Sequence, residues 1–445
     1  MAKPSKISGF PEWLPQQKIA EDKLIASIKR VYESYGFVPI ETPAVELLST
    51  LGSKGVIDKE IFTVQRLRAE AGEEAEFGLH FDLTVPLARY VAQHEHELSF
   101  PLKRYQLQKV WRGDRPQRGR FREFYQFDID IIARNELPLA CDAEVVSVVG
   151  LVMNELKVTG PYSLRINNRK LLMGLYQAIG LQNDVACKKA ITAVDKLLKI
   201  GADGVAKELR QIEGISESEI SKILESTTIR CGPKDLKTRI ESLGVKSALV
   251  DEGVNDLVVV CDLLPEEVVQ NLTIDVSLAR GLDYYTGLIL EVGLSKYPEF
   301  GTLIAGGRYE NLASEFTDQK LPGVGVSIGL TRFMDLLFSE GLIDTSRKSP
   351  SQLLVAVYSE ADRPHCNRIA QQLRDLGVAT EVFYKAPKLG KQIEYAEQRG
   401  MRYVLFIDSS SKEMQVKDLV TKEQTPVSST EILASKVRSA TVHGA

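Results

Sequence analysis

The segment that most constrains the fold of this chain is a strand-like run, Phe121–Ile132, which directly follows an arginine-rich loop. Successive side chains of a strand point to opposite faces of its sheet. One face is apolar and is formed by Phe121, Tyr125, Phe127, Ile129 and Ile131. The other face carries Arg122, Phe124, Gln126, Asp128 and Asp130. The second face is too polar for a core, so we expect it to form the floor of a binding site. The ligand would have negatively charged groups, a flat part and some positive charge.

The loop before this strand, Arg112–Arg122, holds five arginines in a chain whose formal net charge is only -4. The guanidinium group is a fixed fork of donors that suits phosphate and carboxylate. We predict a hairpin over Tyr105–Ile132 in which Arg112 and Arg122 are anchored on the two strands beside the phosphates of a nucleotide. Phe124 could stack on its base. The alternative is a solvated basic loop with no ligand.

The length of 445 residues exceeds what a single hydrophobic core usually supports. We expect an α+β catalytic domain over residues 1–342, built on an antiparallel sheet flanked by helices. Residues 170–260 are rich in short amphipathic stretches and predict a helical insertion within that domain. After a polar linker at 344–352, strands and helices alternate, which predicts a separate C-terminal α/β domain over 353–445.

Composition excludes several classes of protein. The five cysteines are scattered and form no CxxC pair, which argues against disulfides and zinc and for a reducing, cytoplasmic compartment. The five histidines show no metal spacing, so no protein-ligated metal is predicted. No signal peptide is recognised, and the longest apolar run, Val145–Met153, is too short to cross a bilayer.

Three glycine-containing motifs follow later in the chain. In the first motif, Ala279–Gly287, Arg280 follows a predicted strand (Leu272–Leu278) and stands in a glycine turn before Tyr284 and Tyr285. This pattern predicts a ligand pocket or an ordinary hairpin. Ala305–Tyr309 has two adjacent glycines, which let a ligand approach the backbone or let the chain turn.

The third motif, Gly323–Arg332, has GxGxxxG spacing rather than the GxGxxG of a dinucleotide site. Its last residue, Arg332, falls in the first turn of a predicted helix. We therefore expect a phosphate clamp at this helix N-terminus.

Asp82 and Thr84 are two residues apart on a predicted strand, where they share one face and suit an ammonium group or a simple cross-strand pair. With Arg112, Arg122, Arg280 and Arg332 directed at a nucleotide, this pattern suits phosphoryl or nucleotidyl transfer by positioning and electrostatics.

Five segments of the chain resemble a known family. YGFVPIETPAVE (35–46), WRGDRPQRGRFREFYQ (111–126) and GVGVSIGLTRFMDLL (323–337) resemble motifs 1, 2 and 3 of class II aminoacyl-tRNA synthetases. ARGLDYYTG (279–287) and AGGRYENL (305–312) are similar to the two signatures of histidyl-tRNA synthetases. The resemblance runs from about residue 8 to the end and implies histidine, ATP with Mg²⁺ and tRNA-His as substrates of a homodimer.

The resemblance also implies residue roles. Arg112 and Arg280 would be catalytic, binding the α-phosphate and the substrate carboxylate. The residues implied to bind histidine are Asp82, Thr84, Arg112, Gln126, Asp130, Arg280, Tyr284, Tyr285 and Tyr309. The residues implied to bind ATP are Arg112, Asp114, Arg122, Phe124 and Arg332. We assign Arg115, Gln117, Arg118 and Arg120 to the acceptor end of the tRNA, and the resemblance places Pro43 at the dimer interface.

Two alternatives stay open. One is the non-catalytic regulatory paralogue of ATP phosphoribosyltransferase, although that paralogue generally lacks a C-terminal domain like 353–445. The other is a synthetase-like domain that senses tRNA. The chain also departs from the family pattern, since Phe81-Asp82-Leu83 stands where bacterial forms commonly have Pro-Glu-Gly. In the tail, Lys388, Lys391 and Gln392 are candidate anticodon contacts.

Overall fold

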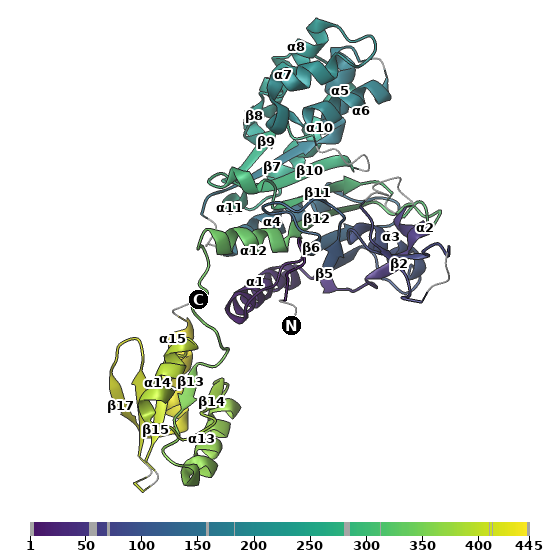
Figure 1. Cartoon of the computed structure of the whole chain (residues 1–445). Coiled ribbons are helices and arrows are strands. Elements are labelled where there is room, and N and C mark those ends of the chain that lie inside the picture. Colours follow the sequence, from purple (N-terminus) through teal and green to yellow (C-terminus); the bar gives the residue numbers. More distant parts are fainter. Residues whose placement is uncertain are drawn as a thin grey trace. The chain divides into compact units, whose positions relative to one another are not determined.

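The computed structural model describes residues 4–52, 60–68, 72–156, 160–181, 183–279, 285–311, 313–408, 410–411 and 413–442. The chain forms two compact units. The first comprises Met1–Pro11 and Ala26–Leu342, and the second comprises Glu12–Ile25 and Ile343–Ala445. Figure 1 labels their helices and strands.

The first unit is built on a nine-stranded sheet with the order β1-β5-β6-β12-β11-β10-β7-β9-β8 among the described residues. Its strands are β1 (Val38–Pro39), β5 (Leu102–Trp111), β6 (Glu123–Ile132), β7 (Tyr162–Asn168), β8 (Arg230–Cys231), β9 (Leu272–Asp275), β10 (Tyr285–Leu294), β11 (Ile304–Tyr309) and β12 (Gly323–Gly329). Within the described ranges, only the β1–β5 and β7–β9 pairs of this sheet are parallel. The expected antiparallel architecture is therefore confirmed.

The hairpin of β5 and β6 forms where the alternating sequence predicts it. Its register pairs Leu102 with Ile132 at one end and Trp111 with Glu123 at the other. On the apolar face, the Phe127 ring packs edge-on against Tyr32 of helix α1 (Pro15–Ser34) at 5.0 Å between ring centroids. Helices α4 (Leu139–Glu155) and α12 (Leu330–Ser339) also pack against β6. This burial leaves the polar face of β6 on the opposite side of the sheet.

A smaller sheet, ordered β2-β4-β3, contains β2 (Val45–Leu47), β3 (Thr63–Val64) and β4 (Phe77–Leu79), with helix α2 (Leu48–Leu51) beside it. The predicted strand placement of Asp82 and Thr84 is wrong, because helix α3 (Thr84–Gln93) begins there. The Asp82 carboxylate accepts hydrogen bonds from the backbone N–H groups of Thr84 and Val85, at 3.2 and 3.0 Å. Aspartate satisfies the free donors of a helix start, and Pro86 is tolerated in the first turn.

The stretch predicted to be a helical insertion is indeed mostly helical (Figure 1). It contains α5 (Arg169–Ile179), α6 (Asp184–Val194), α7 (Leu197–Leu209), α8 (Glu217–Ser226), the 3₁₀ turn η2 (Pro233–Asp235), α9 (Leu236–Glu241) and α10 (Ala248–Asp262), followed by α11 (Glu266–Val269). The sequence specifies several of these starts: the Asn168 side chain caps α5, and Ser216 with Glu219 forms a capping box on α8.

The strand predicted to run to Leu278 ends earlier, because β9 stops at Asp275. The buried Asp275 carboxylate accepts hydrogen bonds from the N–H and hydroxyl groups of Ser277, which turns the chain out of the sheet. Arg165 of β7 pairs with the same carboxylate at 3.2 Å. A local side-chain bond to the backbone thus replaces the continued ladder that the alternation alone suggests.

The second unit has the predicted α/β character. Its five-stranded sheet, ordered β14-β13-β15-β16-β17, comprises β13 (Leu353–Val355), β14 (Thr380–Val382), β15 (Tyr403–Ile407), β16 (Met414–Asp418) and β17 (Gln424–Val427). The first three are parallel, and β16 and β17 are antiparallel. Helices η4 (Glu360–Asp362), α13 (Arg363–Asp375), α14 (Leu389–Gln398) and α15 (Thr430–Val442) accompany them. Gln392 is fully buried and bonds both backbone groups of Val357, so it is not available as an anticodon contact.

Candidate active site

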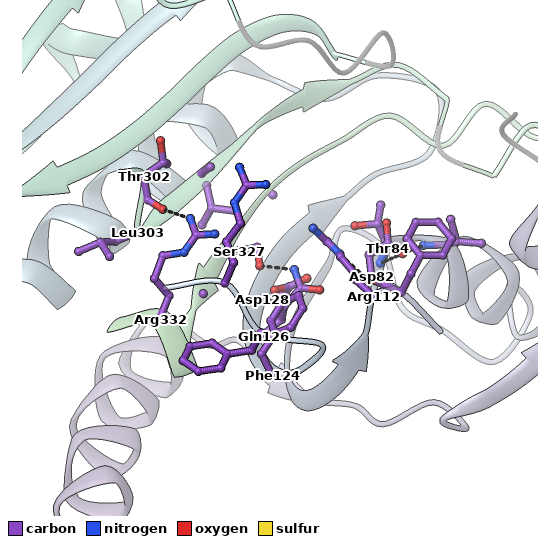
Figure 2. Close-up of a pocket in the computed structure, with 18 of the residues that line it drawn as sticks. Asp82, Thr84, Arg112, Phe124, Gln126, Asp128, Thr302, Leu303, Ser327 and Arg332 are labelled. Carbon is purple, nitrogen blue, oxygen red and sulfur yellow. Dashed lines mark hydrogen bonds between the residues drawn. The ribbon is translucent and has the colours of Figure 1, made fainter. Parts of the chain in front are cut away.

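The polar face of β6 forms the floor of a cavity of about 380 Å³ in the first unit. Strands β10, β11 and β12, the start of α3 and the arginine loop supply the other walls. In the view of Figure 2, Arg332, Thr302 and Leu303 stand at one end, and Asp82, Thr84 and Arg112 at the other. Gln126 and Asp128 lie between these groups.

Most of the residues proposed from the sequence to bind histidine or ATP meet in this cavity. Those that line it are Asp82, Thr84, Arg112, Asp114, Phe124, Gln126, Asp130, Tyr285, Tyr309 and Arg332. Arg280 and Tyr284 lie outside the described residues. The remaining predicted residues of the arginine loop differ in their placement.

Arg112 is held rigidly at the end of strand β5. Its Nε donates to the carbonyl oxygen of Phe81 at 2.9 Å, and its guanidinium carbon lies 5.3 Å from the centroid of the Phe124 ring. The ring and the cation therefore support each other in the cavity wall. An arginine fixed in this way offers its two terminal nitrogens to a ligand anion.

Arg332 is held in the first turn of α12. Its Nε donates to the carbonyl of Gly119 at 2.7 Å, and one terminal nitrogen donates to the carbonyl of Thr302 at 2.8 Å (Figure 2). These two carbonyl oxygens position the cation. The predicted anion-binding arginine at this helix start therefore does face the cavity.

The arginine loop divides differently from the prediction. Arg122 precedes β6, donates to the Asp114 carbonyl at 3.1 Å and is not among the cavity-lining residues, whereas Arg120, assigned to tRNA, does line the cavity. Arg118 is ion-paired with Glu340 at 2.7 Å and lies over the Phe300 ring at 4.5 Å. Arg115 and Gln117 are exposed.

A buried charge cluster beneath the cavity contains a residue that sequence reasoning missed. Arg104 of β5 is completely buried and forms an ion pair with Asp130, its cross-strand partner on β6. The Tyr309 hydroxyl donates to the other Asp130 oxygen at 3.0 Å. Alternation along β5 places Arg104, Gln106 and Gln108 on one face, and this signal, combined with the hairpin register, could have found it.

Burial controls the ionisation of two carboxyl groups in this cluster. It raises the pKa of Asp130 to about 6, although Arg104 and Tyr309 oppose the rise. It raises the pKa of Asp128 to about 7, opposed by Arg104 and the Ser327 hydroxyl and reinforced by Asp130 and Asp82. Desolvation disfavours the charged form, so both groups gain from a cationic ligand.

Two glycines of β12 make room for large side chains of the neighbouring strands. A Cβ atom at Gly325 would lie 1.9 Å from the Asp130 carboxylate, and one at Gly323 would lie 2.4 Å from the Tyr309 ring. Gly306 and Gly307 lie inside β11, so the alternative that they let the chain turn is wrong. Small residues are needed because neighbouring strands direct large side chains into the same space.

Comparisons with known proteins agree with this geometry. Residues 9–333 match the family model described as histidyl-tRNA synthetase, and residues 352–438 match the model described as an anticodon binding domain. The crystal structure of histidyl-tRNA synthetase from Nostoc sp. PCC 7120 superimposes with a TM-score of 0.89 and 35% identity, covering 99% of this chain and 100% of that one. The fold and the motifs thus define a class II aminoacyl-tRNA synthetase.

Relatives among curated proteins are more specific. A histidine–tRNA ligase from Thermobifida fusca is 45% identical, covering 95% of this chain and 96% of its own length. Another, from Stenotrophomonas maltophilia, is 42% identical with 96% of both chains covered. The chain therefore belongs to the histidyl-tRNA synthetase family.

A structure titled as an ATP phosphoribosyltransferase regulatory subunit/histidyl-tRNA synthetase, from Bacillus halodurans C, superimposes with a TM-score of 0.74. It is only 17% identical, covering 91% of this chain and 99% of that one, so the likeness concerns the fold alone.

Two features are absent from the described residues. No helix there is both long enough and apolar enough to cross a membrane. No group of three or more His, Cys, Asp or Glu side chains within the same described ranges could hold a metal ion.

Proposed function

We propose that this protein activates L-histidine with ATP to give histidyl-adenylate and pyrophosphate, and then transfers the histidyl group to the 3′ end of tRNA-His. The observation that carries the proposal is the cavity on the polar face of β6. It has arginines fixed at its ends and a buried carboxylate cluster between them. Such a site can hold an anionic nucleotide and a cationic amino acid at the same time.

In the first step, a carboxylate oxygen of histidine attacks the α-phosphorus of ATP in line. A new P–O bond forms to the amino acid, and the P–O bond to pyrophosphate breaks. Negative charge grows on the α-phosphate oxygens, and Arg112 stabilises it from a fixed position, so little reorganisation is needed. Arg280 is the second proposed arginine for this charge. In the second step, a ribose hydroxyl of the terminal adenosine of the tRNA attacks the adenylate carbonyl. A new ester C–O bond forms, the hydroxyl proton is lost, and the C–O bond to the phosphate breaks and releases AMP.

The nucleotide lies between Arg112 and Arg332 in this proposal. Phe124 stacks on the adenine, Asp114 approaches its rim, and Arg332 holds the γ-phosphate end. The cation–π contact between Arg112 and Phe124 already fixes the stacking ring. Arg120 lines the same cavity and adds a further positive charge.

Histidine is selected by the cluster around Asp130, together with Tyr285, Tyr309 and the proposed Tyr284. Both ring nitrogens of imidazole need partners, and the cavity supplies buried polar groups that a smaller or apolar side chain would leave unpaired. Unpaired buried groups penalise such substrates heavily. Asp82, Thr84 and Gln126 hold the ammonium and carboxylate end.

Mg²⁺ would accompany ATP as its counter-ion, bound mainly by phosphate oxygens and water. The ion would neutralise phosphate charge.

The protein acts in the cytoplasm as a homodimer. Support for the dimer comes from exposed apolar side chains on β1 and the small sheet, near the exposed Pro43: Val38, Val45, Leu47 and Phe77 are 48%, 40%, 39% and 42% exposed. Support for the cytoplasm comes from five cysteines that all remain free thiols. The proposed catalytic domain comprises residues 1–342, with the proposed insertion at 170–260. The proposed anticodon-binding domain comprises residues 353–445. The proposed acceptor-end contacts are Arg115, Gln117 and Arg118.

Histidine-dependent ATP–pyrophosphate exchange by the purified protein tests the function. We expect exchange with histidine, ATP and Mg²⁺ but none with histidinol, which lacks the carboxylate. Arg112→Ala should lower exchange by orders of magnitude while histidine still binds. Absence of exchange in the wild-type protein would overturn the proposal and favour a non-catalytic regulatory role.

A further inference from the structure

Asp128 is a buried carboxylate in the cavity floor to which the family motifs assign no role. It lies in the middle of β6, is only 3% exposed, and lines the cavity between Gln126 and Asp130. Among the described residues, its Oδ1 atom has no hydrogen-bond partner, and neither has the buried Oε1 atom of Gln126. A buried acceptor without a partner is costly, so two of them beside one cavity call for a ligand that donates hydrogen bonds.

Two neighbouring groups, Gln126 and Arg104, contact residues other than Asp128. The Gln126 amide nitrogen donates to the Ser327 hydroxyl at 2.7 Å (Figure 2). Arg104, the buried cation of the cluster, forms its ion pair with Asp130. Ser327 lies directly opposite Asp128 in the register of β12 and β6. These contacts orient Gln126 and Asp128. Arg104 favours the charged form of Asp128, but within the described residues its ion pair is with Asp130.

Asp82, a further acidic residue of the cavity wall, is already partly in use. One oxygen of Asp82 accepts the N–H groups of Thr84 and Val85 and so caps helix α3. A carboxylate engaged in this way has less capacity to neutralise a buried ammonium group. Asp128, on strand β6, supplies a negative charge that can neutralise such an ammonium group.

Given the function proposed above, on which this inference rests, we propose that Asp128 determines specificity by binding the α-ammonium group of histidine together with the Gln126 Oε1 atom. An ammonium group has three donors and a full positive charge, which match two buried acceptors of which one is anionic. The imidazole ring is matched by the separate Asp130 and Tyr309 pair. Selection against amino-acid analogues without a charged amine follows from the same contact.

The experiment compares two inhibitors of wild-type and Asp128→Asn protein in histidine-dependent exchange. Histidinol keeps the amine and the imidazole, whereas imidazole propionate keeps the carboxylate and the imidazole but lacks the amine. We expect the substitution to weaken histidinol roughly 10- to 100-fold, the range for a lost hydrogen bond to a charged group. Binding of imidazole propionate should be unchanged or tighter, because no unpaired carboxylate is then buried beneath it.

Equal weakening of both inhibitors, or no change in either, would overturn the inference. Asp130→Asn is the matched control on the same strand, and it should weaken both inhibitors because they share the imidazole. If Asp128→Asn fails to fold, Gln126→Met tests the same point, with a smaller selective loss of histidinol. Lack of exchange in the wild-type protein would instead refute the proposed function itself.

Discussion

Arg104→Met is the substitution that best tests the account of the charge cluster. Arg104 is completely buried, and its ion pair with Asp130 crosses the β5–β6 hairpin. Removing one partner of a buried pair leaves an uncompensated charge and costs about 3–5 kcal/mol. For a unit the size of Ala26–Leu342, that loss lowers the unfolding temperature by roughly 4–7 °C.

The loss should depend on pH in a defined direction. The pKa of Asp130 is raised by burial to about 6 and is held down by Arg104. A raised carboxyl pKa means that the folded state binds its proton more tightly, so this group stabilises the fold most at low pH and less as pH rises. Without Arg104 the pKa rises further, and the decline continues to higher pH. The difference between variant and wild type should therefore be larger at pH 8 than at pH 5.

Thermal unfolding of the full chain at pH 5 and pH 8 measures this difference, and exchange assays measure the KM for histidine. Arg165→Met is the matched control, since Arg165 lies in the same sheet and pairs with Asp275 and Glu291 but does not line the cavity. Arg165→Met should lower stability without changing the KM for histidine, whereas Arg104→Met should raise that KM. A destabilisation that is equal at both pH values would refute the reasoning.

Three further predictions follow from the same contacts. In Gly325→Ala the new Cβ would lie 1.9 Å from the Asp130 carboxylate, so the carboxylate must move. The KM for histidine should therefore rise at least about tenfold, with little change in the KM for ATP. Equal effects on both substrates in exchange assays would contradict this. Arg118→Ala should raise the KM for tRNA in aminoacylation while exchange is unaffected. Because the ion pair of Arg118 is exposed, the substitution should cost less than about 1 kcal/mol of stability. An unchanged KM for tRNA would remove Arg118 from the acceptor-end site. Between pH 5.5 and 7.5 the thermal stabilisation by histidinol should grow relative to that by imidazole propionate. Burial raises the pKa of Asp128 to about 7, so Asp128 becomes charged over this range and can pair with the amine of histidinol. A constant difference between the two compounds would contradict the role of Asp128.

The sequence by itself determined the local features of this protein. Period-two alternation identified strand β6 and its polar face, and Phe124, Gln126 and Asp130 do lie together in the cavity. Alternating strands and helices predicted the α/β character of the second unit, but not its segment Glu12–Ile25. These features are readable because the spacing of apolar residues reflects which side of a strand or helix is buried.

The tertiary structure decided which residues stand opposite one another. Arg104 and Asp130 are far apart in sequence and meet only through the hairpin register, and Gly325 is required only because β12 lies beside β6. Asp82 caps a helix instead of extending a strand, and Arg120 rather than Arg122 reaches the cavity. Register and strand order arise from packing over the whole sheet, which no local pattern contains. The five-arginine loop was therefore recognisable as an anion-binding element from sequence, but the place of each arginine was not.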